Sequence, residues 1–160
     1  MKNIFLFLFC CFLSHSLWSQ LPANMYLDIA YAPFYYGVAS FDPSESQVII
    51  WTHITPDSAS QSAIDVDWDI ATDSNFVDIV KSGTYSADTT FDWTVSVYVD
   101  NLNPYTTYYY RFSALGRTSA IGRTRTAPAA DNEHLRLAVC SCSNYAYGYF
   151  HGYGHLAKRE

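Results

Sequence analysis

The sequence of 160 residues is poor in basic side chains and in cysteine. It holds nine Lys and Arg against 15 Asp and Glu, which gives a formal net charge of -6. An acidic surface repels nucleic acid and anionic lipid, so we expect neither as a primary partner. The sequence also lacks internal repeats, low-complexity tracts and an apolar run long enough to cross a bilayer. We therefore expect neither a repeat architecture nor a membrane span after leader removal.

Residues 1–19 have the three-part pattern of a secretory signal peptide. Lys2 precedes the apolar run IFLFLFCCFL, and polar and small residues follow it. The run is too short for a stable membrane anchor, and it lacks the amphipathic period of a buried helix. We expect cleavage near Ser19 and export to the periplasm or the extracellular space. The general secretory route fits because no twin arginine is present.

Two cysteines, Cys140 and Cys142, remain after the leader is removed. On a strand their Cα atoms would lie about 6.6 Å apart with parallel Cβ vectors, at the edge of disulfide geometry. Exported proteins usually pair their thiols. We therefore expect another role for this pair.

Alternation of apolar and polar residues predicts an all-β domain over residues 20–127. The alternation is clearest in IDVDWDIA (64–71) and FDWTVSVYV (91–99). With turn signals between them, about seven strands fit a fibronectin type III or Ig-like Greek-key sandwich. The other strands are expected near Val38 and in SQVIIWTHI (46–54), IVKSGTY (79–85), TTYYYRFSAL (106–115) and SAIGRTRTA (119–127).

Two features favour the fibronectin type III form of this sandwich. Leu102, Pro104 and Tyr108 resemble the corner in which a tyrosine hydroxyl hydrogen-bonds to upstream backbone. Trp51 stands where such domains bury a tryptophan on the second strand. Alternatively, Trp51 and Tyr108 are large core residues of another sandwich.

The composition changes after residue 127. TAPAADNEH indicates a linker over residues 128–134, and LRLAVCSC indicates a buried strand. NYAYGYFHGYGHLAKRE then has an apolar stripe at helical spacing. Its three glycines each cost about 1 kcal/mol in a helix interior, so this helix needs a partner surface. The stripe consists of Tyr145, Tyr149, Tyr153 and Leu156.

Five segments, agreeing in order and spacing, resemble the alkaline phosphatase D (PhoD-like) family. They cover nearly everything after the leader. In that family a β-sandwich domain precedes a metallophosphatase catalytic domain. We expect residues 135–160 to form the start of that catalytic domain. The segments are YGVASFDPSESQVIIWTHITP, WDIATDSNF, SGTYSADTTFDWTVSVYVDNLNPYTTYYYRF, GRTRTAP and LRLAVCSCSNYAYGYFHGYGHLAKRE.

The resemblance implies an exported hydrolase of phosphomonoesters and phosphodiesters, with iron and calcium at its site. The first metal ligand of the family is a cysteine in a Ser-Cys step after the first catalytic strand. The matching step is Ser141-Cys142, so the resemblance assigns Cys142 as an iron ligand. A thiolate at the end of a buried strand suits this role. Cys140 has no counterpart, and we expect it to be a small apolar core residue.

The other metal ligands of the family have no counterpart in these 160 residues. One ligand cannot hold a catalytic ion or activate water on it. We therefore expect a truncated chain, monomeric, inactive alone and without a stably bound metal. The chain also has Phe41 where the family commonly shows glycine, and it lacks the twin arginines of many family signals.

Two other functions fit parts of the pattern. The chain could be a secreted binding or adhesion module of the fibronectin type III kind, if the tail from Leu135 folds back onto the sandwich. It could also belong to another two-domain metallophosphatase group, such as the purple acid phosphatases, although the Ser-Cys step fits that group less well.

Smaller groups of residues have both a functional and a structural interpretation. His151 and His155 have the spacing of zinc ligands, but no Glu stands between them and solvated or packed histidines are favoured. Arg123 and Arg125 could grip a phosphate, although a solvated strand face is the preferred interpretation. Isolated histidines (His53, His134) are expected in core or surface roles, and an acidic stripe is expected to be exposed: Asp65, Asp67 and Asp69.

Overall fold

The computed structural model describes residues 27–129, 138–141 and 150–158. Contacts divide the chain into two units, Met1–Ala127 and Pro128–Glu160. All strands of the described residues belong to the first unit.

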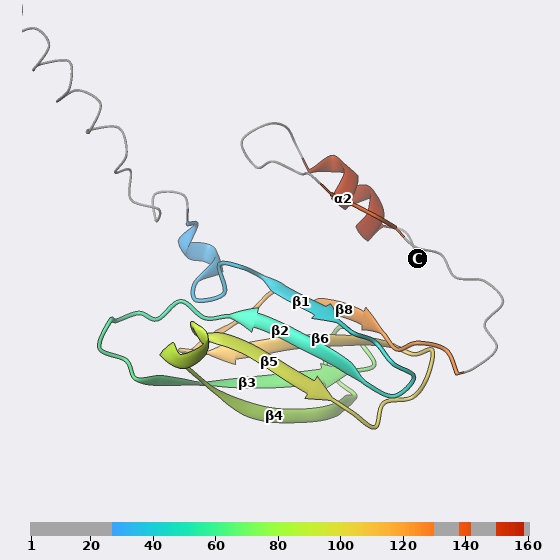
Figure 1. Ribbon diagram of the computed structural model, residues 1–160, viewed down its shortest axis with the longest axis horizontal. Helices are drawn as coiled ribbons and strands as arrows, with labels where there is room; N and C mark the ends of the chain where they lie inside the picture. Colours follow the sequence, from blue (N-terminus) through green and yellow to red (C-terminus); the bar gives the residue numbers. More distant parts are fainter. Residues whose placement is uncertain (1–26, 130–137, 142–149, 159–160) are drawn as a thin grey trace, which may run out of the picture. The chain divides into compact units, whose positions relative to one another are not determined.

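The first unit is a sandwich of two antiparallel sheets (Figure 1). Sheet A has the strand order β1-β2-β5, and sheet B has the order β4-β3-β6-β7, with β8 also paired to β6. Short 3₁₀ helices, η2 (Ile29–Tyr31) and η3 (Thr89–Phe91), precede β1 and β5. The strands are β1 (Val38–Phe41), β2 (Val48–His53), β3 (Ala63–Ala71), β4 (Ile79–Asp88), β5 (Thr94–Val99), β6 (Thr107–Ala114), β7 (Arg117–Thr118) and β8 (Gly122–Arg125).

Strands β7 and β8 are two parts of one edge strand. Ser113 of β6 pairs with Thr118 of β7, and Tyr110 of β6 pairs with Gly122 of β8. Two residues lie between Tyr110 and Ser113, whereas three lie between Thr118 and Gly122. The extra residue makes a bulge that the Ser119 side chain and backbone tie to Phe112. Counted this way the sandwich has seven strands, and the predicted all-β fibronectin-like fold is confirmed.

The core lies between the two sheets and is formed by alternate residues of each strand. On β3, Ile64, Val66 and Ile70 are buried while Asp65 and Asp67 are exposed, as the period-two pattern predicted. The remaining buried members come from both sheets and the segments that join them: Phe34, Val48, Ile50, Ile54, Ala87, Val95, Val99, Leu102, Tyr108, Tyr110, Phe112 and Ala114.

Trp51 corrects one prediction. β2 is the central strand of sheet A and is buried on both faces, as expected. However, Val48, Ile50 and Thr52 are the residues that face the core, so Trp51 lies on the outer face and is half-buried. The tryptophans that pack against the core are instead Trp68 and Trp93.

The start of β5 differs from the prediction as well. The strand begins at Thr94 rather than at Phe91. The Asp88 carboxylate accepts a hydrogen bond from the Thr90 N–H and caps η3, and Asp92 and Trp93 then adopt positive φ values of 50° and 57°. This left-handed backbone reverses the chain, which ends the pairing with β2 at Thr94.

The predicted tyrosine corner is confirmed. The Asn103 N–H donates a hydrogen bond of 2.9 Å to the Tyr108 hydroxyl oxygen. Tyr108 is fully buried and Leu102 packs beside it in the core. The corner therefore ties the β5–β6 connection to the middle of the sandwich.

Removing the Tyr108 hydroxyl should destabilise the sandwich. In Tyr108→Phe the Asn103 N–H loses its acceptor in a partly buried place, which should cost about 1 kcal/mol in the free energy of unfolding. Urea denaturation of residues 20–160 measures this. The matched control Tyr98→Phe removes a hydroxyl from an exposed ring and should change stability by less than about 0.5 kcal/mol. Equal losses in both variants would contradict the role given to the corner.

The second unit contains a short helix, α2 (His151–Ala157). The predicted strand over LRLAVCSC is not formed at residues 138–141, the part of it that the structure describes. No described residue of this unit is buried, which is the physical reason: nothing in the described chain covers these apolar groups. None of the helices among the described residues has the length and hydropathy of a membrane span.

Candidate functional site

The predicted metal ligand, Cys142, lies outside the described residues. Its neighbour Cys140 is an exposed free cysteine, so the expected core role for Cys140 is wrong. Val139 beside it is also exposed. Because no described residue packs over this stretch, the thiol stays at the surface.

The two described histidines of the second unit are exposed. His151 and His155 are one helical turn apart on α2. The helix is shorter than the sequence predicted, and a Cβ added at Gly152 or Gly154 would meet no atom within 4 Å. Among the described residues, no group of three or more His, Cys, Asp or Glu side chains could hold a metal ion. The remaining isolated histidine, His134, lies outside the described residues.

The charged residues that lie on strands of the sandwich belong to sheet B, since the strands of sheet A have no Asp, Glu, Lys or Arg. Arg111 donates two hydrogen bonds to one Asp69 oxygen, from Nε at 3.0 Å and from Nη2 at 2.9 Å, and its guanidinium lies 4.1 Å from the centre of the Phe76 ring. Thr84 donates to Asp67 at 2.7 Å. The acidic stripe is thus exposed at Asp65 and Asp67, as expected, but Asp69 is half-buried and paired.

Arg123 and Arg125 lie exposed on β8, one on each side of Thr124. The Arg125 guanidinium stacks on the Tyr105 ring at 3.7 Å. Their exposure agrees with the preferred interpretation, a solvated strand face. Because both arginines are exposed on an edge strand, they could attract an anion but do not enclose it.

A cavity of about 460 Å³ lies beside η2. The segment before β1 supplies most of its wall, and residues 118–120 of the bulge close it. Sequence reasoning missed this cavity because the aromatic arm has no regular period. Its aromatic lining is Tyr31, Phe34, Tyr35 and Tyr36.

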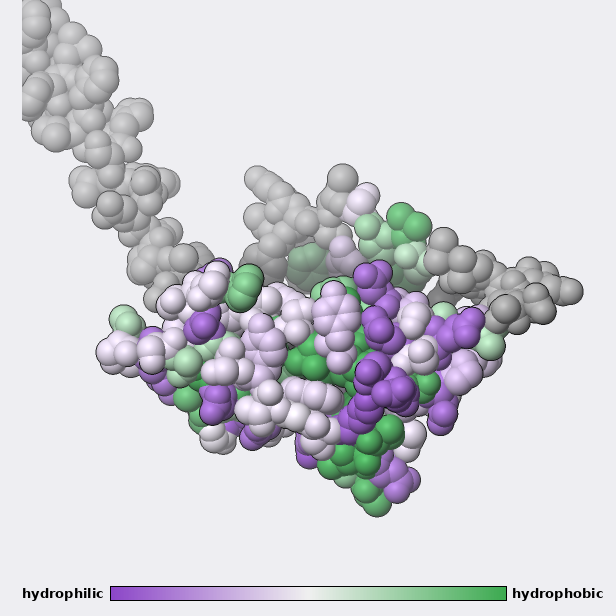
Figure 2. Space-filling model, turned by 60° about the horizontal axis from the view of Figure 1, so that its bottom comes forward, coloured by the Kyte–Doolittle hydropathy of each residue, from purple (hydrophilic) through white to green (hydrophobic). Residues whose placement is uncertain are grey.

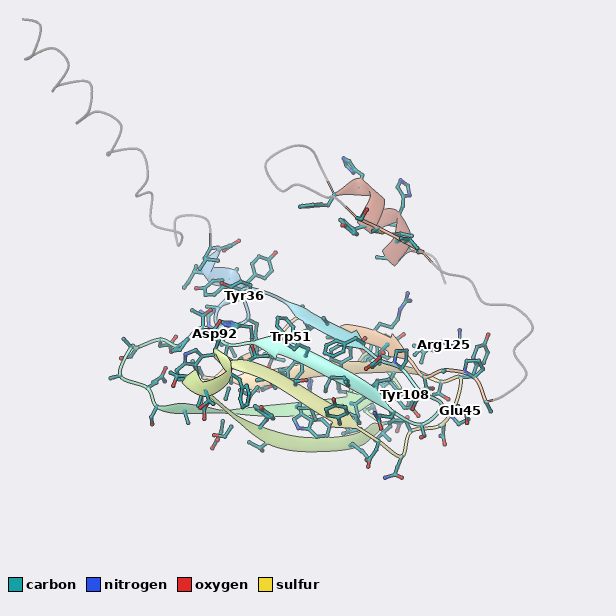
Figure 3. The ribbon with its side chains drawn as sticks, viewed as in Figure 1. Tyr36, Glu45, Trp51, Asp92, Tyr108 and Arg125 are labelled. Atoms are coloured by element: carbon teal, nitrogen blue, oxygen red, sulfur yellow. The ribbon has the colours of Figure 1, made fainter. Side chains whose placement is uncertain are left out.

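His53 lies at one end of sheet A against the Tyr36 ring, whose centroid is 4.6 Å from the imidazole centroid in an edge-on arrangement. Its Nε2 is 3.9 Å from an Asp92 oxygen, and its buried Nδ1 has no hydrogen-bond partner among the described residues. Figure 3 shows Tyr36 and Asp92 at this end of the sandwich. Two side chains and one ring are too few to hold a metal ion.

Among the described residues, three groups have shifted pKa values, and all three shifts have structural causes. Backbone N–H groups donate hydrogen bonds to the Asp73 carboxylate and lower its pKa, with the bond from Asp78 contributing more than that from Val77. The same hydrogen bonds hold the β3–β4 turn. A hydrogen bond from Lys81 lowers the pKa of Asp100. Burial raises the pKa of Tyr110. These groups hold turns and core.

Comparison with known proteins identifies the sandwich. Residues 21–128 match the family model described as "PhoD-like phosphatase, N-terminal domain". The chain is 38% identical over 135 residues to alkaline phosphatase D of Bacillus subtilis (strain 168), a match that covers 80% of this chain and 23% of the relative.

Solved structures agree with this result. The chain matches a structure described as "Structure of PhoD" with a TM-score of 0.74 and 36% identity, over 83% of this chain and 27% of that one. The chain therefore spans about a quarter of the length of the relatives that it matches.

Proposed function

Because the chain belongs to the PhoD-like phosphatase family, we propose that it forms the N-terminal part of an exported hydrolase of phosphomonoesters and phosphodiesters. One observation carries this proposal. The match to alkaline phosphatase D is 38% identical and covers 80% of this chain, and the model of a phosphatase N-terminal domain matches residues 21–128. Both matches are to phosphatases, which favours this proposal over a free-standing binding module.

The sandwich does not supply the reaction centre in this proposal. The described residues lack a cluster that could hold iron or calcium, so they do not fit the metal group of the family. Cys142, which lies outside the described residues, is the one position that the family resemblance assigns as an iron ligand. When bound, iron and calcium would supply charge stabilisation and an activated water for attack on phosphorus.

The first test asks whether residues 20–160 have activity. The polypeptide is incubated with iron and calcium salts and assayed on a chromogenic phosphate ester. We expect turnover at the background rate, because a single assigned ligand cannot hold a catalytic ion. Turnover well above background would contradict the inactivity of this segment.

The second test uses the complete phosphatase that contains this chain. Cys142→Ser should reduce bound iron and turnover by at least the 10–100-fold typical of losing even an outer-shell partner. Cys140→Ser is the matched control two residues away, and it should retain both. Iron content by mass spectrometry and ester turnover are measured on the same samples. Retention of iron in Cys142→Ser would remove the assignment.

Export is tested separately. The mature protein, isolated from the culture fluid or the periplasm, should begin near residue 20 when its N-terminus is determined by mass spectrometry. A cell-retained protein that still begins at Met1 would contradict export.

A further inference from the structure

The cavity beside η2 is lined by aromatic rings that remain open to solvent. Tyr31 is 63% exposed and Tyr36 is 64% exposed, and both line the cavity. Single exposed aromatic residues are ordinary on a protein surface, but two of them on one hollow form a shared contact surface. The volume of about 460 Å³ falls in the range of small-molecule sites.

Hydrogen bonds hold the walls of this cavity in place. The Arg117 guanidinium of β7 donates from Nη1 to the Ile29 carbonyl oxygen at 3.0 Å, which ties η2 to the edge strand that closes the cavity. The Thr52 hydroxyl of β2 donates to the Gly37 carbonyl oxygen at 2.8 Å, and the Gly37 N–H donates to the Phe34 carbonyl oxygen at 2.9 Å. The cavity is therefore built into the sandwich, and a ligand need not order its walls on binding.

The lining of the cavity is uncharged. No Asp, Glu, Lys or Arg is among the described residues that line it. In Figure 2 the surface at the upper left, where the described residues begin, is mostly pale, the colour of intermediate hydropathy, rather than purple. An ionised ligand would lose water in the cavity without gaining a partner of opposite charge, which costs free energy. The cavity therefore suits a neutral ligand and not the phosphate group of an ester substrate.

The polar side-chain groups left open in the lining are tyrosine hydroxyls. The hydroxyls of Thr118 and Ser119 already make hydrogen bonds within the sandwich, at 3.2 Å and 2.7 Å. Among the described residues, no hydrogen-bond partner is present for the hydroxyls of Tyr31, Tyr35 and Tyr36. A wholly apolar ligand would cover these hydroxyls without satisfying them, which costs free energy. A ligand that combines an apolar face with several hydroxyls avoids this cost.

We propose that this cavity is a binding site for a neutral pyranose sugar. A pyranose ring has an apolar face of C–H groups that stacks on an aromatic ring, and its hydroxyls exchange hydrogen bonds with tyrosine hydroxyls. It carries no charge, so the uncharged lining imposes no electrostatic penalty. The inference goes beyond the proposed function and does not rest on it, since the site lies within the sandwich. Such a site lets the sandwich hold the protein on a glycan.

The experiment titrates residues 20–160 with two neutral disaccharides, cellobiose and maltose. Saturation-transfer NMR and calorimetry follow the binding. We expect saturable binding of at least one disaccharide, with the strongest saturation transfer at the ring C–H protons. The uronic acid of each disaccharide, in which a carboxylate replaces one primary alcohol, should bind at least about tenfold more weakly. No saturable binding of either neutral disaccharide, or equal binding of the charged and neutral forms, would overturn the proposal.

Variants place the binding in the cavity. Tyr31→Ala removes an exposed ring from the lining and should weaken binding about tenfold, whereas Tyr31→Phe keeps the ring and should weaken it only about threefold. Tyr98→Ala is the matched control, because Tyr98 is 67% exposed but lies on β5 of sheet A, and it should leave the affinity unchanged. Tyr36→Ala serves as the second variant if Tyr31→Ala reduces the melting temperature of residues 20–160.

Other occupants of the cavity give different results. Equal affinity in Tyr31→Ala and Tyr98→Ala would place the sugar elsewhere and overturn the proposal. A dimer of residues 20–160 that Tyr31→Ala dissociates in sedimentation would also overturn it, because a second copy would then be the occupant. Sugar binding that is lost in the complete phosphatase would overturn it too, since the cavity would then be closed in the working protein.

The sugar titrations need neither metal nor ester turnover, so the two proposals fail separately. A complete phosphatase that binds iron and turns over ester but binds no sugar refutes the sugar site and leaves the proposed function intact. A complete protein that binds sugar but neither binds iron nor turns over ester refutes the proposed function alone.

Discussion

Replacing Phe112 by alanine is expected to lower the free energy of unfolding of the sandwich by about 3–5 kcal/mol. Phe112 is 0% exposed and lies on β6, the strand between β3 and the divided edge strand. Its ring meets Tyr110 edge-on with centroids 6.2 Å apart and pairs across the sheet with Trp68. The hydrogen bonds that tie its backbone to Ser119 hold the strand in place, so the site cannot close over the lost volume.

Urea denaturation of residues 20–160 measures this loss. Natural domains have unfolding free energies of about 5–15 kcal/mol, so Phe112→Ala should be marginally folded at 25 °C. Phe91→Ala is the matched control, because Phe91 is 69% exposed at the end of η3. Its change should stay within about 0.5 kcal/mol. A loss under about 1 kcal/mol for Phe112→Ala would show that the core can repack around the gap.

The core residues around Phe112 could be predicted from the sequence, because the two-residue period of inward-facing residues is unbroken in this region. In β3 Asp residues alternate with apolar ones, and in β6 Arg111 and Ser113 flank Phe112, so each strand has a single preferred inner face. The tyrosine corner was accessible for a related reason: its three residues are close in sequence, and one hydrogen bond defines it. Local patterns of this kind do not depend on distant partners.

The misplacement of Trp51 has the opposite cause. The run VIIW is apolar at every position, so alternation cannot tell which residues face the core. The choice is made by pairing with β1 and β5, which puts Val48 and Ile50 inside. The positive φ of Trp93 is likewise a tertiary effect, since large side chains rarely adopt it in isolation.

The candidate reaction centre was accessible only through family resemblance. No spacing within the chain distinguishes Cys142 from Cys140, because a metal site is defined by side chains that arrive from several strands.

A second large effect is expected from Gly122→Ala. A Cβ at this position of β8 would lie 2.1 Å from Cζ of Tyr110 and 2.5 Å from its Cε1 and hydroxyl oxygen. Tyr110 is buried in the sandwich core, so its ring cannot move into solvent to make room. Such overpacking costs about 1–3 kcal/mol or more, which exceeds the 0.4–1 kcal/mol that alanine gains by restricting the unfolded chain. The net result should be destabilisation by about 1–2 kcal/mol.

A double-mutant cycle with Tyr110→Leu tests whether the clash with this ring is the cause. Tyr110→Leu removes the ring that a Cβ at position 122 would strike, so Gly122→Ala should cost at least about 1 kcal/mol less in that background. Gly152→Ala in α2 is the contrasting control: no atom lies within 4 Å of the added Cβ, and helicity should rise by the equivalent of about 1 kcal/mol. If Gly122→Ala were equally costly with and without the Tyr110 ring, the loss would have to come from the β8 backbone instead. Glycine is therefore required at position 122 because an aromatic ring of the opposite strand occupies the space above it.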